Sequence, residues 1–119
     1  MTVFGKNMKW TVDRAYRDRV RALFLEGLGA SQPEGGPPHV ELYRLSDGFQ
    51  IGIFLVDEAE APRAEDLKKQ PWLEFIVEDV EATAAKLAEL GIEEVSYFDK
   101  AHHYYAAPGG PVFRLAKAG

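Results

Sequence analysis

The chain of 119 residues contains no cysteine, and this absence excludes three chemistries. Without thiols there are no disulfides, no thiolate metal ligands and no cysteine nucleophile. Residues 1–11 lack an apolar core of signal-peptide length, and no apolar run approaches the roughly 18 residues that a membrane span needs. We therefore expect a cytoplasmic protein that does not interact with a membrane.

Positive charge is also scarce. The chain has fourteen Lys and Arg and nineteen Asp and Glu, which gives a net charge of -5, and its longest basic run is Lys68-Lys69. Nucleic-acid binding depends on clustered basic residues that neutralise phosphates, so we expect no nucleic-acid partner. The sequence also has no Gly-x-Gly-x-x-Gly motif, and Pro108-Gly109-Gly110 is typical of a hairpin turn instead of a phosphate loop.

What the sequence does contain is an internal repeat. Leu28-Gly29 and Leu90-Gly91 lie 62 positions apart, and each ends an apolar helical stretch. A glycine turn and an alternating strand then follow in both halves, at residues 46–53 and 108–115. A chain of this length is large enough for one core and too short for two independent ones, so the repeat predicts two similar modules within one domain.

Each half has the order strand, helix and three strands, with the second strand of the first half degraded. Asp13 and Asp79 are the predicted helix N-caps. Three prolines prevent a regular strand in residues 30–39, and residues 57–71 form a polar linker bounded by proline. In the first module (about 5–56) we predict strands at 7–12, 40–45 and 49–56 and a helix at 13–28. In the second module (about 72–117) we predict strands at 72–77, 94–98, 102–106 and 112–116 and a helix at about 80–90.

Three segments carry a family resemblance: residues 75–80, 87–91 and 108–115. With the two βαβββ modules, they resemble the vicinal oxygen chelate superfamily, the group of glyoxalase I, bleomycin-resistance proteins and extradiol dioxygenases. The resemblance covers essentially the whole chain, residues 1–119. It implies an α+β fold in which two tandem βαβββ modules form a cupped mixed sheet, with the helices on its convex face and a ligand on its concave face. It also implies a homodimer, and we expect a bacterial protein.

Most enzymes of that superfamily hold a divalent metal through His, Gln or Glu on the first and last strands of each module. In this chain the four positions fall on Trp72 and Arg114 in the second module, and on Asn7 (or Lys6) and Gly52 in the first. A guanidinium stays charged at any accessible pH and repels a divalent cation. We therefore predict that the metal site is lost and that no cofactor is bound.

The same positions predict a ligand-binding surface. We expect Trp72, Glu74 and Arg114 to share the concave face, where the indole could stack on the guanidinium or on a ligand ring, as a binding platform for an aromatic or anionic small molecule. Arg114 favours an anionic ligand and the acidic balance of the chain favours a cationic one, so both ligand charges stay open. Gln50 could donate to a ligand, with Gly52 leaving room for it, and Asn7 lies nearby. The alternative is that Arg114 only pairs with Glu74, and that Trp72 fills the concave face as core.

The cluster His102-His103-Tyr104-Tyr105 supplies the candidate catalytic residues. Adjacent residues of a strand point to opposite faces, so only one histidine and one tyrosine can enter the concave face. A histidine there could act as a general base with a tyrosine as partner acid. A solvent or dimer contact is the alternative. A new metal site made of His39 and Glu41 with His102 or His103 is a further, weaker hypothesis.

The sequence thus predicts a glyoxalase/bleomycin-resistance-like protein that binds a small organic molecule in a metal-free pocket. Two alternatives stay open. One is an enzyme of the same superfamily, a lyase, isomerase or dioxygenase, with atypical metal ligands or a histidine base. The other is a structural or partner-binding module whose concave face is filled by its own side chains.

Overall fold

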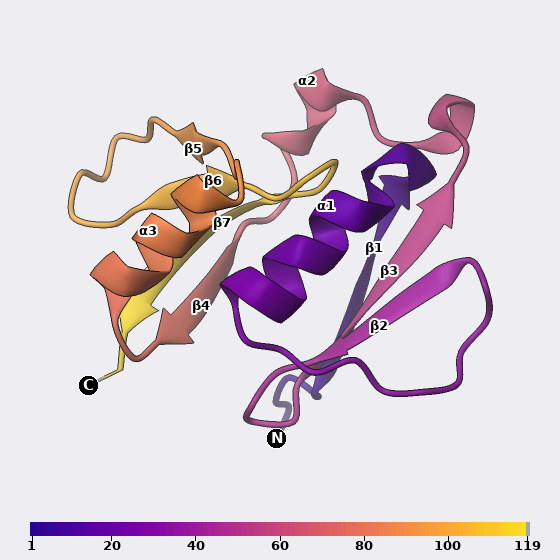
Figure 1. The fold of residues 1–119 in the computed structure, drawn as a ribbon, viewed down its shortest axis with the longest axis horizontal. Coiled ribbons are helices and arrows are strands. Elements are labelled where there is room, and N and C mark those ends of the chain that lie inside the picture. Colours follow the sequence, from indigo (N-terminus) through magenta and orange to yellow (C-terminus); the bar gives the residue numbers. More distant parts are fainter. Residues whose placement is uncertain (119) are drawn as a thin grey trace.

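The computed structural model describes residues 1–118 and contains two halves of similar plan (Figure 1). The first half comprises β1 (Asn7–Asp13), the one-turn helix η1 (Arg14–Tyr16), α1 (Arg17–Ala22), η2 (Leu23–Gly27), β2 (Val40–Arg44) and β3 (Gln50–Val56). The second half comprises β4 (Leu73–Val77), α3 (Val80–Glu89), β5 (Glu94–Val95), β6 (Tyr104–Ala106) and β7 (Val112–Lys117). Between them, the predicted linker contains two short helices, η3 (Glu58–Glu60) and α2 (Ala64–Leu67).

The strands form two mixed sheets. The first has the order β1-β3-β2 and the second the order β4-β7-β6-β5. In each sheet the first strand of the module pairs in parallel with the last one, β1 with β3 and β4 with β7, and the other pairs are antiparallel. In place of a regular second strand, the first module has an isolated β-bridge between Ser31 and Arg44. The backbone groups of these two residues exchange hydrogen bonds of 2.9 and 2.8 Å.

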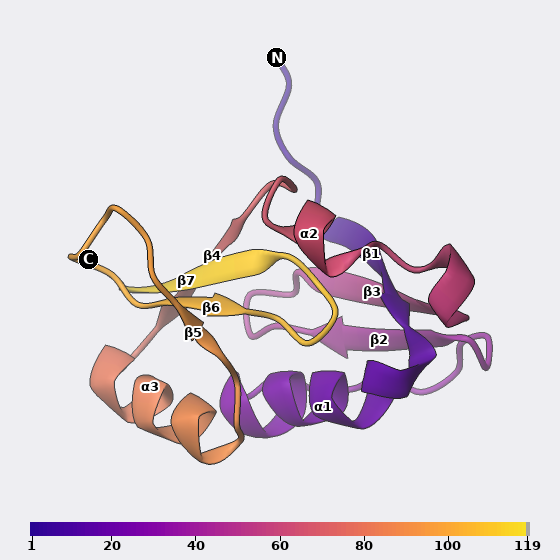
Figure 2. The same cartoon turned by 90° about the horizontal axis from the view of Figure 1, so that it is seen from above.

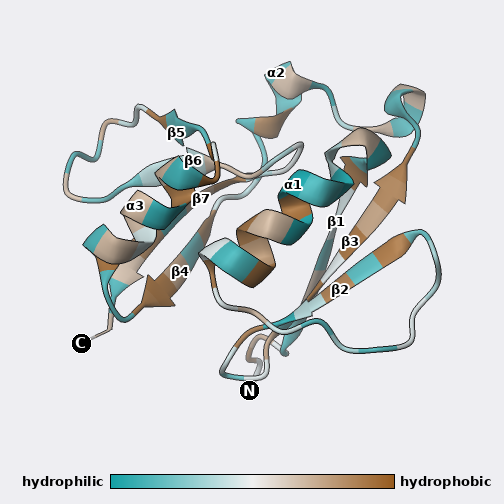
Figure 3. Cartoon of the chain, in the orientation of Figure 1, coloured by the Kyte–Doolittle hydropathy of each residue, from teal (hydrophilic) through white to brown (hydrophobic). Residues whose placement is uncertain are grey.

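Both modules place their helices on the same side of the sheets, where α1 and α3 lie next to each other (Figure 2). A glycine permits this approach, because a Cβ at Gly27 would lie 2.7 Å from the Leu87 side chain of α3. Phe24 stacks on Tyr43 of the first sheet at 4.7 Å and meets Phe75 of the second edge-on at 6.4 Å. The apolar residues of β3 and β4 (Figure 3) thus face one shared core.

The predicted helix 13–28 is divided in three, and its last turn widens so that Leu28 N–H donates to Leu23 C=O at 2.9 Å. Predicted strands 94–98 and 102–106 are also shorter in the structure, because residues 96–103 leave the sheet. The Asp99 carboxylate accepts the Ala101 N–H at 2.8 Å, and this local turn competes with strand pairing. Within residues 1–118, none of the helices has the length and apolar character of a membrane span.

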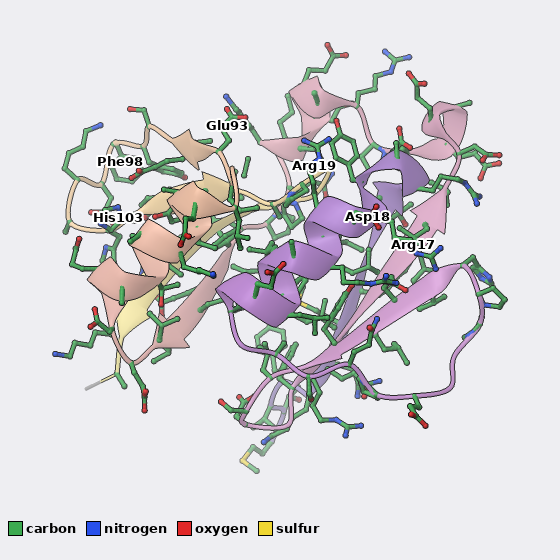
Figure 4. All side chains as sticks on the ribbon, in the orientation of Figure 1. Arg17, Asp18, Arg19, Glu93, Phe98 and His103 are labelled. Atoms are coloured by element: carbon green, nitrogen blue, oxygen red, sulfur yellow. The ribbon has the colours of Figure 1, made fainter. Side chains whose placement is uncertain are left out.

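One carboxylate is buried in this core. Glu41 is 5% exposed and lies on the helix-facing side of β2, where Arg21 donates to it at 2.7 and 3.0 Å and Tyr43 at 3.1 Å. Arg17, labelled in Figure 4, adds a contact of 3.4 Å. Burial alone raises the pKa of the Glu41 carboxyl, but the hydrogen bonds from Arg21 and Tyr43 outweigh burial, so the net pKa is lowered.

Glu41→Gln should lower the free energy of unfolding by about 2–3 kcal/mol, because it leaves two guanidinium groups beside a buried site without their counter-charge. Urea denaturation at pH 7 measures this loss. Because the folded-state pKa of Glu41 is lowered, its contribution is present above the unfolded value of 4.5 and is lost as the pH falls through the folded pKa. The exposed Glu58→Gln is the control, and equal losses for both variants would contradict the prediction.

Candidate functional site

Three polar side chains form a row across the second sheet. Glu74, Arg114 and Tyr104 are register neighbours on β4, β7 and β6. Their sequence neighbours Phe75, Phe113, Leu115 and Tyr105 are buried against the helices. The row therefore lies on the opposite side of the sheet. We call this side, with Trp72 just before β4, the cup face.

Arg114 is the centre of the cup face. Its Nε donates to the Glu74 carboxylate at 2.7 Å, its Nη2 lies 2.7 Å from the same oxygen as an ion pair, and its guanidinium lies 4.7 Å from the centroid of the Trp72 ring. Its Nη1 donates to the Tyr104 hydroxyl at 3.1 Å and to Asp99 at 3.3 Å. Hydrogen bonding to Tyr104 and then to Glu74 raises the pKa of Arg114 above its usual value, so the group stays charged.

Asp99 lies in the loop between β5 and β6 and links this loop to the cup face. The sequence analysis did not identify Asp99 as a site residue. One oxygen of its carboxylate accepts from His102 Nδ1 at 2.7 Å and from the Tyr104 hydroxyl at 3.0 Å. The hydrogen bond from the Ala101 backbone, followed by that from His102, lowers the pKa of Asp99. The only sequence signal was an acidic residue three positions before a histidine.

The four candidate catalytic residues separate into two pairs. His102 and Tyr104 lie on the cup side and meet at Asp99, whereas His103 and Tyr105 lie on the helix side. His103 (Figure 4) contacts Glu94 at 2.9 Å and Glu81 at 3.4 Å. Burial raises the pKa of Tyr105 to about 12. The structure therefore excludes His103 and Tyr105 from the cup face.

The candidate residues of the first module lie on the first sheet, whereas Glu74 and Arg114 lie on the second. Asn7 and Gln50 are register partners on β1 and β3, and the Gln50 side chain accepts from Arg44 at 3.4 Å. A Cβ at Gly52 would meet Leu42, Lys9 and Phe54 at 3.6–3.7 Å. The six predicted ligand-binding residues are thus divided between the two sheets, and their common role in ligand binding stays a prediction.

A cavity of about 840 Å³ lies at the seam between the two modules. Asn7 and Glu74 both line it, and apolar side chains from the N-terminal segment, β1 and β4 supply much of the rest, among them Phe4, Met8, Leu73 and Ile76. Its volume suits a small organic ligand. Glu74 is the residue of the polar row that also lines this seam cavity.

The family-type metal positions do not fit a metal ion. They carry an indole at Trp72, a guanidinium at Arg114, an amide at Asn7 and no side chain at Gly52, and Glu74 is already held by Arg114 at 2.7 Å. Within the described part of the chain, no group of three or more His, Asp and Glu could hold a metal. The hypothesis of a site at Glu41 and the histidines is wrong, because Glu41 is buried among arginines on the helix side.

Comparisons with solved structures identify proteins of similar fold. No family model matches the sequence, and no curated protein matches it. A FosX fosfomycin resistance protein mutant from Listeria monocytogenes, in complex with Mn(II) and 1S,2S-dihydroxypropylphosphonic acid, has a TM-score of 0.75 at 13% identity, with 100% of this chain and 95% of that chain covered. A possible glyoxalase from Bacillus cereus has a TM-score of 0.67 at 19% identity, with 96% and 98% covered.

A lactoylglutathione lyase from Agrobacterium tumefaciens has a TM-score of 0.65 at 15% identity, with 98% of this chain and 95% of that chain covered. The identities are low, so these likenesses concern the fold. They confirm the predicted α+β architecture over the whole length of the chain.

His103→Gln should destabilise the protein at pH 6 and leave its stability unchanged at pH 9. The hydrogen bond to Glu94, with a smaller contribution from Glu81, raises the folded-state pKa of His103. Stabilisation by a raised pKa is complete below the unfolded value and is lost as the pH rises through the folded pKa. We expect a loss on the order of 0.5 kcal/mol at pH 6, measured by urea denaturation. His39→Gln is the control. A larger loss of stability for His103→Gln at pH 9 than at pH 6 would contradict the prediction.

Proposed function

We propose that this chain, which has the fold of the vicinal oxygen chelate superfamily, binds a small organic molecule on its cup face without a metal ion. The observation that carries the proposal is the Arg114 guanidinium between Trp72 and Glu74. The FosX structure named above contains a small ligand, and this agrees with ligand binding by the fold. The cup face of this chain presents an aromatic ring and hydrogen-bonding groups in place of metal ligands.

The charge balance of the cup face favours a cationic ligand. Arg114 is the single cationic side chain of the row, and two carboxylates, Glu74 and Asp99, already contact it. The three groups together carry one net negative charge, and the net charge of the chain, -5, has the same sign. An anionic ligand would have to compete with both carboxylates for Arg114, whereas a cation is attracted by the one excess negative charge of the three groups.

The aromatic groups of the cup face favour a flat ligand. Trp72 is 43% exposed, with Arg114 on its ring and the Tyr104 ring edge-on at 6.0 Å. An exposed indole beside a carboxylate attracts a ring that carries a positive charge, through stacking and the cation–π interaction together. The proposed ligand class is therefore a planar molecule with a cationic group.

The cation 1-methylquinolinium should bind more tightly than the anion 1-naphthoate, which has a similar ring size. Trp72→Ala and Glu74→Gln should each weaken quinolinium binding about tenfold, because one removes the stacking surface and the other a negative charge. Isothermal titration calorimetry gives the dissociation constants. Treatment with EDTA should leave them unchanged.

Glu78→Gln is the matched control, because Glu78 is an exposed carboxylate that directly follows β4. Tighter binding of 1-naphthoate than of 1-methylquinolinium would overturn the proposed ligand charge. If Trp72→Ala and Arg114→Ala both left quinolinium binding intact, the proposed surface would be wrong. Loss of binding after EDTA would overturn the metal-free proposal.

We also propose that the chain forms a homodimer through the seam. β1 and β4 are the outer strands of their sheets, so each has one side without a strand partner in the described chain. Unpaired strand edges are ready to pair with another chain. Exposed apolar side chains gather at the seam cavity, among them Ile76, which is 56% exposed, and the neighbouring Phe4 and Met8. The N-terminal segment that carries Phe4 extends away from the body (Figure 2).

Light scattering should give a mass twice the 13.3 kDa of the chain. Ile76→Lys should convert the dimer to a monomer, because it places a charge in the apolar contact. Phe98→Lys is the control, since Phe98 is also an exposed apolar residue but lies on the loop between β5 and β6 (Figure 4). A monomeric wild-type protein at 100 µM, or an Ile76→Lys variant that stays dimeric, would contradict the proposal.

A further inference from the structure

We propose that Tyr97 competes with the ligand for the cup face, and that the loop of residues 96–102, which carries it, serves as a lid. The inference rests on the proposed function, because it assigns a regulation to the same ligand surface. Tyr97 occupies in this structure a position that a ligand ring would take, so binding of a ligand to the inner part of the cup face requires the loop to move.

Tyr97 covers the ring of Tyr104. The two rings are stacked, with centroids 4.4 Å apart and planes 22° from parallel. Tyr104 lies on the open side of the sheet, yet it is only 3% exposed, because Tyr97, Trp72 and Arg114 surround it. Trp72 stays accessible. The aromatic surface of the cup face is therefore half open at Trp72 and half closed at Tyr104.

The loop is held to the cup face by side chains. Apart from the strand pairing of its neighbours, no backbone–backbone hydrogen bond joins residues 96–102 to the rest of the described chain. The Asp99 carboxylate makes the connection instead, through Tyr104 at 3.0 Å and Arg114 at 3.3 Å. Both partners are the cup-face groups that would contact the ligand. A cationic ligand that attracts the Asp99 carboxylate therefore competes for the same contacts that hold the loop closed.

The loop has the features of a segment that opens at low cost. Few backbone hydrogen bonds and little buried apolar surface are typical of regions that open locally. Phe98, next to Tyr97, is 86% exposed, so it anchors the loop to no core. Opening would therefore break the ring stack of Tyr97 on Tyr104 and the two contacts of the Asp99 carboxylate with Tyr104 and Arg114, while the β4-β7-β6 ladder stays in place. The ring of the ligand replaces the stack on Tyr104 that Tyr97 gives up.

When Tyr97 covers the surface for part of the time, the apparent dissociation constant of the ligand equals the intrinsic constant divided by the fraction of time that the surface is uncovered. Tyr97→Ala removes the competitor and should bind 1-methylquinolinium at least about threefold more tightly than the wild type, which corresponds to a surface uncovered one third of the time or less. Phe98→Ala is the matched control, because it removes the adjacent ring without uncovering Tyr104, and its affinity should equal that of the wild type.

The lid is tested without any ligand by hydroxyl-radical footprinting with mass spectrometry, which reports side-chain exposure. Oxidation of Tyr104 should rise severalfold in Tyr97→Ala and stay at the wild-type level in Phe98→Ala. Asp99→Asn, which keeps the Tyr97 ring but weakens the charged contacts of the loop, should give an intermediate rise. Tyr105, buried on the helix side, is the internal reference, and constant oxidation of it shows that each variant is folded.

The two measurements separate the possible failures. If Tyr104 in Tyr97→Ala stays as protected as in the wild type, Tyr97 is not the cover and the inference is overturned. If the wild type binds 1-methylquinolinium and Tyr97→Ala binds it no more tightly, Tyr97 does not compete with the ligand and the inference is also overturned. If Tyr104 becomes exposed but neither protein binds the probe, the cover is supported and the proposed function fails.

Discussion

The rest of the structure depends on one shared core in which the two modules meet. Phe24 packs on Tyr43 of the first sheet and against Phe75 of the second, and Gly27 lets the two helices approach at Leu87. Because both sheets direct their apolar faces to the same helices, both must direct their other faces outward. The cup face exists for this reason: every second residue of β4, β6 and β7 is left out of the core and is available for polar contacts.

On the cup face, a set of fixed charges stands where a protein of this fold could hold a metal. Glu74 and Asp99 balance Arg114, and the indole of Trp72 lies over the same guanidinium. Such an arrangement orders the side chains through mutual hydrogen bonds and therefore needs no ion to organise it. The same contacts connect the loop to the surface, so ligand binding and loop position share one carboxylate, Asp99. The proposed lid follows from this shared group, whereas the proposed function rests on Arg114 between Trp72 and Glu74.

Much of the fold could be predicted because its signals are local. The apolar alternation of 73–77 and 112–116, the cap at Asp79 and the glycine at 91, with φ of +75°, each depend on neighbours in sequence. Residues 96–103 could not be predicted in the same way. Their pattern is equally compatible with a strand. The Asp99–Ala101 turn takes them out of the sheet, and contacts with Tyr104 and with Arg114, 15 positions from Asp99, hold them against the cup face.

The sequence by itself determined the two modules, the alternation that separates His102 from His103, and the chemical character of the positions that lack metal ligands. These follow from chain periodicity and residue type, which no packing can change. Only the tertiary structure decided that Asn7, Gln50 and Gly52 lie apart from Trp72 and Arg114, that Glu41 is buried among arginines, and that Tyr97 covers Tyr104. The reason is physical: which faces meet depends on how two amphipathic halves bury their apolar surfaces together, and this is a property of the whole chain.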